Sequence, residues 1–102
     1  MGADVFYEVY PGKNANEAFA SAVHDAKYDH GHAGYTGSIA EKDDFVIVSK
    51  QVFDSRSDAA DYANKLIEEG DPRIDDKWGP AGCVSFKQND KVMYMFFGWA
   101  SS

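Results

Sequence analysis

Three histidines with neighbouring carboxylates are the first residues in this chain that could do chemistry. His24, His30 and His32 lie within nine residues of one another. Asp25 and Asp29 lie between the first two of them. Imidazole and carboxylate groups together suit zinc, iron or nickel, but a closed metal site needs about four ligands. Because the rest of the chain offers no obvious complement, we expect these histidines to lie at the surface or to cap a helix. We expect no bound metal and no other cofactor.

Two glycine-rich segments share one residue pattern. GYTGSIAEK at 34–42 aligns without a gap on GPAGCVSFK at 79–87, and each segment ends in a lysine. The amides of a Gly-x-x-Gly turn can converge on an anion, although the spacing matches neither a Walker A loop nor a dinucleotide fingerprint. Glycines also serve simply to form tight turns. Either the chain is an internal duplication of a helix–strand–strand unit, or the two segments share only turn chemistry.

Polar and aromatic side chains beside these glycines could hold a small ligand. Two carboxylates, a lysine and a tryptophan stand together in DDKWGP at 75–80. Trp78 either stacks on a ligand or closes the end of the core. We expect a small binding protein that holds a small polar or nucleotide-like ligand between the two glycine-rich loops. The ligand-binding residues that we expect are His32, Gly34, Tyr35, Thr36, Gly37, Ser38, Lys77, Trp78 and Gly79.

Groups that could carry out catalysis are sparse in this sequence. Cys83 is the only cysteine, and it stands beside Val84 in an expected strand. A cysteine in that setting is usually an inert part of the core. No serine nucleophile motif is visible. A small metal-dependent or acid–base hydrolase would have to use His24, His30 and Asp76, so we expect a binding protein rather than an enzyme.

Composition limits the class of protein and its partners. The 102 residues carry 17 acidic and 10 basic side chains, a net charge of −7, which repels nucleic-acid phosphates at long range. Hydrophobic residues make up 44% of the chain, enough for a single folded domain over residues 1–102. The single cysteine excludes an intrachain disulfide and favours a cytoplasmic location. The longest apolar run, Met93–Phe97, is too short to span a membrane.

The remaining pattern predicts the elements that must position these residues. Five strands are predicted, at 5–9, 35–41, 45–53, 83–87 and 92–99. Asn14 and Ser55 are the predicted caps of two helices, and Gly31 and Gly70 are their predicted ends. The order β-α-β-β-α-β-β predicts an α+β domain with an antiparallel-rich sheet and both helices on one face.

The last predicted strand is apolar on both of its faces. Its sequence, VMYMFFGW at 92–99, lacks the alternation of a half-exposed strand. Such a strand is either central and covered on both sides, or its second face meets a partner. Because two helices on one face leave the other face open, we expect a homodimer.

Three blocks of the sequence, HGHAGYTGSIAEK, DDKWGPAG and FFGWASS, resemble small proteins of unassigned function found in phage and bacterial genomes. The resemblance brings no catalytic residue and no cofactor. It implies an alternative function, since small acidic phage proteins often block host enzymes or defence complexes. Such a protein would dock through carboxylates such as Glu68 and Glu69, or through its C-terminal apolar strand.

Overall fold

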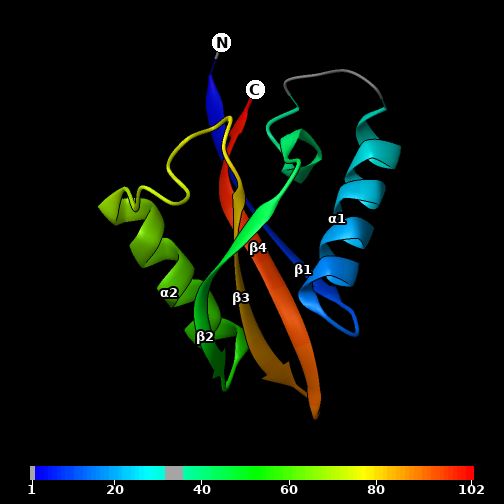
Figure 1. Ribbon diagram of the computed structural model, residues 1–102, viewed down its shortest axis with the longest axis vertical. Helices are drawn as coiled ribbons and strands as arrows, with labels where there is room; N and C mark the ends of the chain where they lie inside the picture. The colour runs from blue at the N-terminus through cyan, green and yellow to red at the C-terminus, as the bar shows by residue number, and fades with distance from the viewer. Residues whose placement is uncertain (1, 32–35) are drawn as a thin grey trace.

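The computed structural model describes residues 2–31 and 36–102 and shows an α+β domain (Figure 1). Its elements are β1 (Ala3–Pro11), α1 (Ala15–His30), the 3₁₀ helix η1 (Ile39–Glu41), β2 (Phe45–Phe53), α2 (Arg56–Glu69), β3 (Ala81–Gln88) and β4 (Lys91–Ser101). The strands form one sheet in the order β1-β4-β3-β2. Two of the three strand pairs are antiparallel, and β2 pairs with β3 in parallel. The predicted α+β class and antiparallel-rich sheet are therefore confirmed.

Both helices begin and end at the residues that the sequence predicts. The side chain of Asn14 accepts a hydrogen bond from the backbone N–H of Glu17, and Ser55 caps α2 in the same way. These contacts satisfy N–H groups that have no partner inside the helix. Gly31 and Gly70 follow the two helices with φ of 69° and 66°, a conformation that glycine adopts without steric cost.

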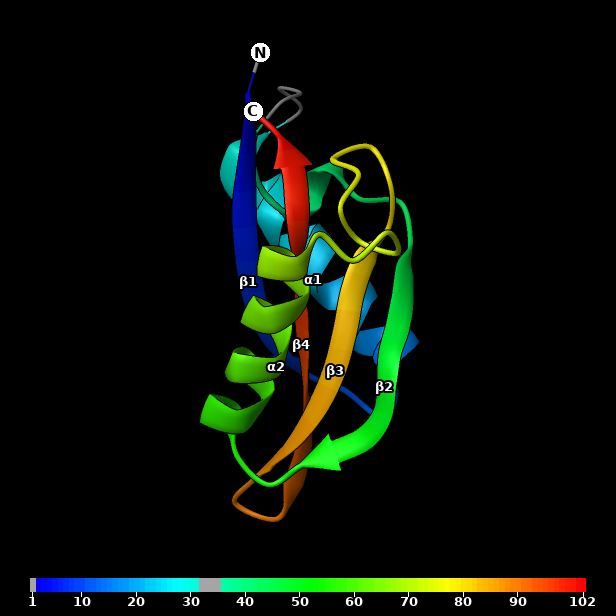
Figure 2. The same cartoon turned by 90° about the vertical axis from the view of Figure 1, so that its left-hand side faces the viewer.

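The two helices lie on opposite faces of the sheet, so the prediction that both share one face is wrong (Figure 2). Neighbouring residues of a strand point to opposite faces. Phe96 of β4 packs in a cluster with Ala22 of α1, whereas Phe97 packs with Ala63 of α2. Because β3 and β4 are apolar on both faces, one helix on each side buries more of them than two helices on one side could.

This arrangement explains the apolar last strand within a single chain. β4 lies between β1 and β3 in the sheet, and its residues 95–98 are buried. The second face of β4 is covered by a helix, so it no longer calls for a partner. The homodimer stays a prediction, without this support.

The expected strand at 35–41 is not a strand over its described part, residues 36–41. The backbone there enters the 3₁₀ helix η1, where Ser38 caps the first turn through the N–H of Ala40. Gly37 has a φ of 69°, which interrupts an extended strand. The sheet consequently has four strands, and β2, which lacks the antiparallel neighbour expected at 35–41, pairs with β3.

The two aligned segments therefore fold differently. Residues 39–41 form η1, whereas the matching part of 79–87 lies in β3. An internal helix–strand–strand duplication is not seen in the described residues, because the first copy lacks its first strand. The two segments still lie near one another, because the first ends just before β2, the second contains the start of β3, and these two strands are parallel neighbours.

Candidate functional site

A buried lysine joins the two loops that precede the parallel strands. Lys42 is 2% exposed, and its ammonium donates hydrogen bonds to the backbone oxygens of Gly79 at 2.8 Å, Lys77 at 3.2 Å and Asp76 at 3.4 Å. Burial lowers the pKa of Lys42, and the nearby Asp76 carboxylate opposes this shift. A charged donor that satisfies three carbonyls in a water-poor setting is a strong restraint. The loop at 36–44 thus holds the loop at 76–79 in place through the side chain of Lys42.

The loop that contains Trp78 is also braced by its own hydrogen bonds. The backbone N–H of Trp78 donates to Asp76 Oδ1 at 2.8 Å, and the backbone N–H of Gly79 donates to the Asp76 backbone oxygen at 2.9 Å. The Lys77 ammonium donates to the Gly2 oxygen and lies 5.4 Å from the centroid of the Trp78 ring. Despite this bracing the indole is 61% exposed. Trp78 therefore does not close the core. Ile74, at 1% exposed, is the residue of this loop that packs into it.

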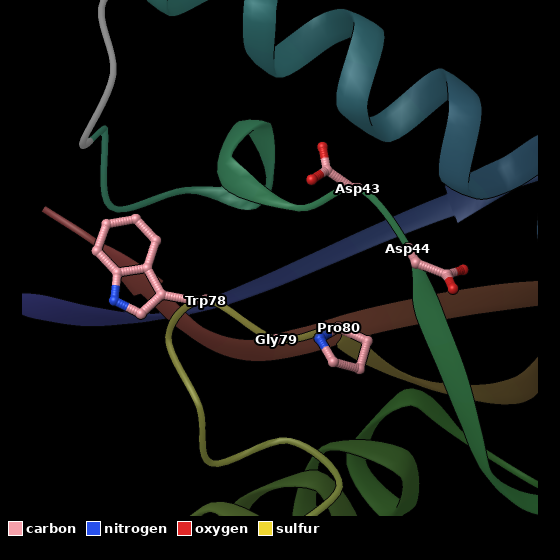
Figure 3. Close-up of a pocket in the computed structure, with 5 residues that line it drawn as sticks. All are labelled: Asp43, Asp44, Trp78, Gly79 and Pro80. Atoms are coloured by element: carbon pink, nitrogen blue, oxygen red, sulfur yellow. The ribbon is translucent and has the colours of Figure 1, made fainter.

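A small hollow lies beside the indole. Its volume is about 240 Å³, and it is lined by Asp43, Asp44, Trp78, Gly79 and Pro80 (Figure 3). Asp44 Oδ1 accepts the N–H of Phe45 at 2.7 Å, which fixes this carboxylate at the start of β2. The Asp43 carboxylate turns toward α1. The hollow thus combines an aromatic surface with a negatively charged margin, which favours uncharged or cationic groups over anions.

The hydroxyl groups of the first loop are engaged within that loop. Thr36 Oγ1 lies 2.7 Å from Ser38 Oγ and donates to Glu41 Oε2 at 2.8 Å. The Gly37 N–H donates to the Ser101 oxygen at 2.8 Å. A Cβ added at Gly37 would lie 2.6 Å from Asp4 Oδ2. These contacts give Thr36, Gly37 and Ser38 a structural role in shaping the loop.

The expected ligand residues are only partly brought together. Lys77, Trp78 and Gly79 lie in the loop at 76–79, and the last two line the hollow. His32, Gly34 and Tyr35 lie outside the described residues. In the sequence Lys42 stands out only as the lysine that ends the segment 34–42. The one signal that points to Asp43 and Asp44 is their position between the strands expected at 35–41 and 45–53.

The histidines and the cysteine do not form a reactive site in the described part of the chain. His24 and His30 are both exposed on α1. Within residues 2–31 and 36–102 no three histidine, cysteine or acidic residues group as metal ligands. Burial raises the pKa of Cys83 to about 12, so its thiol is protonated at neutral pH and a poor nucleophile. His32, the third metal candidate, lies outside the described residues.

Comparison with known proteins finds no family model, curated protein or solved structure that matches this chain. The resemblance to phage and bacterial proteins therefore stays a prediction, and so does the docking function that it implies. None of the helices in the described ranges is long and apolar enough to cross a membrane.

Proposed function

We propose that this chain is a small binding protein that holds a flat, uncharged polar ring against the indole of Trp78. The observation that carries the proposal is an exposed tryptophan on a loop that a buried lysine holds rigid. Exposed aromatic residues on well-supported loops are frequent binding anchors. Because Lys42 and Asp76 already order this loop, little conformational entropy is left to lose when a ligand binds.

The charge around the hollow narrows the class of ligand. Asp43 and Asp44 line it, and Asp76 lies within the supporting loop. The two ammonium groups placed near it, those of Lys42 and Lys77, already donate to backbone oxygens, and that of Lys77 also lies over the indole. Phosphate groups would meet uncompensated carboxylates here. The nucleotide-like ligand expected from the sequence is thereby narrowed to a nucleoside or a similar ring without phosphates.

The size of the hollow agrees with a single ring system. Its volume of about 240 Å³ is below the range of about 300–1,000 Å³ that is usual for whole small-molecule ligands. A base stacked on an aromatic side chain gains about 1–3 kcal/mol. We therefore expect weak binding through stacking on the indole, with the carboxylates accepting hydrogen bonds from the ligand.

Fluorescence of Trp78 tests this function directly. The chain has two tryptophans, so a Trp99→Phe variant leaves Trp78 as the sole reporter. Titration with adenosine should quench its emission more than that of free N-acetyltryptophanamide at the same concentrations. ATP should bind more weakly than adenosine at low salt, and added salt should reduce the difference, because salt screens the repulsion between phosphates and carboxylates.

Two results would contradict the proposal. The first is quenching of Trp78 by adenosine that is no greater than quenching of the free fluorophore. The second is tighter binding of ATP than of adenosine at low salt, which would show that the carboxylates do not select the ligand. Calorimetry on a Trp78→Ala variant, with Trp99 retained, should show that adenosine binding is lost.

The alternative function, docking to another protein, stays a prediction. Glu68 and Glu69 are exposed at the end of α2, and the last turn of this helix has no basic residue. Carboxylates at a helix C-terminus are unfavourably placed in the field of the helix. A basic partner protein would offset this unfavourable interaction. Reversing the charges of Glu68 and Glu69 therefore tests the docking function, because it should weaken binding of such a partner.

A further inference from the structure

A second, larger groove runs between α1 and the start of the chain segment that leads into β2. It has a volume of about 450 Å³ and is separate from the Trp78 hollow except that both include Asp43. It is lined by Phe19, Ala20, Val23, His24, Lys27, Lys42 and Asp43. This volume lies inside the usual range for small-molecule sites.

The floor of the groove is apolar and rigid. The Phe19 ring packs 5.0 Å from the ring of Phe45 and 5.4 Å from that of Phe96, centroid to centroid. Val23 is half-buried and packs against the same core. Aromatic contacts of this kind hold the rings in fixed orientations. The floor can therefore receive an apolar group without rearranging.

The two rims of the groove carry opposite charges. Lys27 and His24 are exposed on α1, and Asp43 is exposed on the facing segment. The Asp43 carboxylate points toward α1 (Figure 3). Among the described residues, the side chains of Lys27 and Asp43 have no hydrogen bond or ion pair, and the one ion pair there joins Arg73 and Asp71. Each rim thus presents a charge that the protein does not neutralise with a direct contact.

The other charged groups near α1 face away from this groove. Burial, and after it the Asp25 carboxylate, raise the pKa of Tyr10 of β1 to about 12. Burial, and after it the Asp29 carboxylate, raise the pKa of Glu8, which also lies in β1. The Lys42 ammonium is turned to the backbone oxygens of the loop at 76–79. Among the residues that line the groove, Lys27 and Asp43 therefore carry the charges that a ligand would meet.

We propose that this groove is a binding site for a small zwitterion with an apolar body, namely an apolar α-amino acid. Its carboxylate would lie at Lys27 and His24, its ammonium at Asp43, and its side chain on Phe19 and Val23. Opposite charges on the rims and an apolar floor complement the three parts of such a ligand. This site goes beyond the ring-binding function of Trp78 and does not depend on it.

Three related ligands test the two rims separately. Leucine carries both charges, leucinamide carries only the ammonium, and isocaproate carries only the carboxylate. Titration of isotope-labelled protein, followed by NMR, should move the amide signals of Val23, Lys27 and Asp43 at millimolar leucine. Leucine should bind about two- to fivefold more tightly than either analogue, the size expected for one exposed ion pair.

Matched variants assign each charge to its rim. Lys27→Gln should weaken leucine about two- to fivefold and leave leucinamide unchanged, whereas Asp43→Asn should weaken leucine similarly and leave isocaproate unchanged. Lys65→Gln makes the same charge change on an exposed residue of α2 and should leave all three affinities unchanged. Trp78→Ala should also leave leucine binding unchanged.

Several outcomes would overturn the proposal. Equal binding of the three ligands would remove the role of the charged rims. An absence of shifts at millimolar leucine, or shifts confined to residues outside the groove, would remove the site. An equal effect of Lys65→Gln and Lys27→Gln would show that only the net charge matters, and loss of leucine binding in Trp78→Ala would show that the groove is not a separate site.

Discussion

The two segments with the same residue pattern, 34–42 and 79–87, share one buried anchor but differ in backbone conformation where both are described, at 36–42 and 81–87. Their matching pairs are Gly37 with Gly82, Ser38 with Cys83, Ile39 with Val84, and Lys42 with Lys87. Ile39 and Val84 are 0% and 1% exposed, so the β-branched residue is core in both. The lysines differ completely, since Lys42 is buried and Lys87 is exposed. A shared pattern thus predicts which residue anchors the segment but not the backbone around it.

The difference arises from where the backbone hydrogen bonds go. The 79–87 segment enters a strand with a neighbour on each side, β2 and β4. The 36–42 segment has no such pair of neighbours. Its Gly37 N–H donates to the backbone oxygen of Ser101, whereas the N–H groups of Glu41 and Lys42 bond locally, to the backbone oxygens of Ser38 and Ile39. Since nearly every buried backbone group must be paired, the available partners decide between strand and 3₁₀ helix.

The lysine pair should give the largest contrast. Lys42→Met removes the charged donor of three carbonyls and is expected to lower the free energy of unfolding by about 3 kcal/mol. Urea denaturation measures this change, and faster hydrogen exchange at Gly79 would report release of the Trp78 loop. Lys87→Met is the matched control and should cost less than about 0.5 kcal/mol. Equal unfolding curves for Lys42→Met and the unmodified chain would show that the buried lysine is not what holds the loop.

The glycine pair, Gly37 and Gly82, should give an intermediate contrast in stability. Asparagine and alanine are expected to rank in opposite order at the two positions. A Cβ at Gly82 would lie 2.7 Å from the buried Phe97 ring, so Gly82→Ala should cost about 1–3 kcal/mol through overpacking. An added Cβ at Gly37 would also be close to an atom, Asp4 Oδ2 at 2.6 Å, but this atom is the movable end of an exposed side chain. The positive φ of Gly37 is therefore the main requirement, and asparagine tolerates it better than alanine.

We therefore expect Gly37→Asn to cost less than Gly37→Ala, and Gly82→Asn to cost more than Gly82→Ala. Thermal or urea unfolding of the four variants gives the two differences. If asparagine were the worse residue at both positions, crowding rather than backbone conformation would explain both glycines.

The pair of Ser38 and Cys83 should differ in how they make stability depend on alkaline pH. The pKa of Cys83 is raised by burial from 9.0 to about 12, so above pH 9 the unfolded thiol loses its proton while the folded thiol keeps it. Stability is therefore fully present below pH 9 and falls as the pH rises toward 12. The loss is roughly 1 kcal/mol at about pH 10.

Cys83→Ala removes this contribution. Its free energy of unfolding should fall less steeply between pH 9 and 11 than that of the unmodified chain, although it starts lower because of the cavity. Ser38→Ala should keep the alkaline slope. Parallel curves for Cys83→Ala and the unmodified chain would contradict a thiol that is protonated in the fold.

Features that depend on neighbouring residues could be predicted well. Asn14 and Ser55 cap their helices as expected because a cap needs only its own side chain and an N–H three residues later. Trp78 and Gly79 could be predicted at the site from the density of special residues in one loop. The sequence predicts that Thr36 and Ser38 bind a ligand, because nothing in it shows that the two hydroxyls bond to each other and that Thr36 donates to Glu41.

By itself the sequence determined the α+β class, both ends of each helix and the strands at either end of the chain. Tertiary structure decided which face each helix covers, whether 36–41 becomes a strand, and that Lys42 is buried beneath the Trp78 loop. The physical reason is range. Caps and alternation act over a few residues, whereas the partners of Lys42 lie 34 to 37 residues away, and only the packed sheet brings them together.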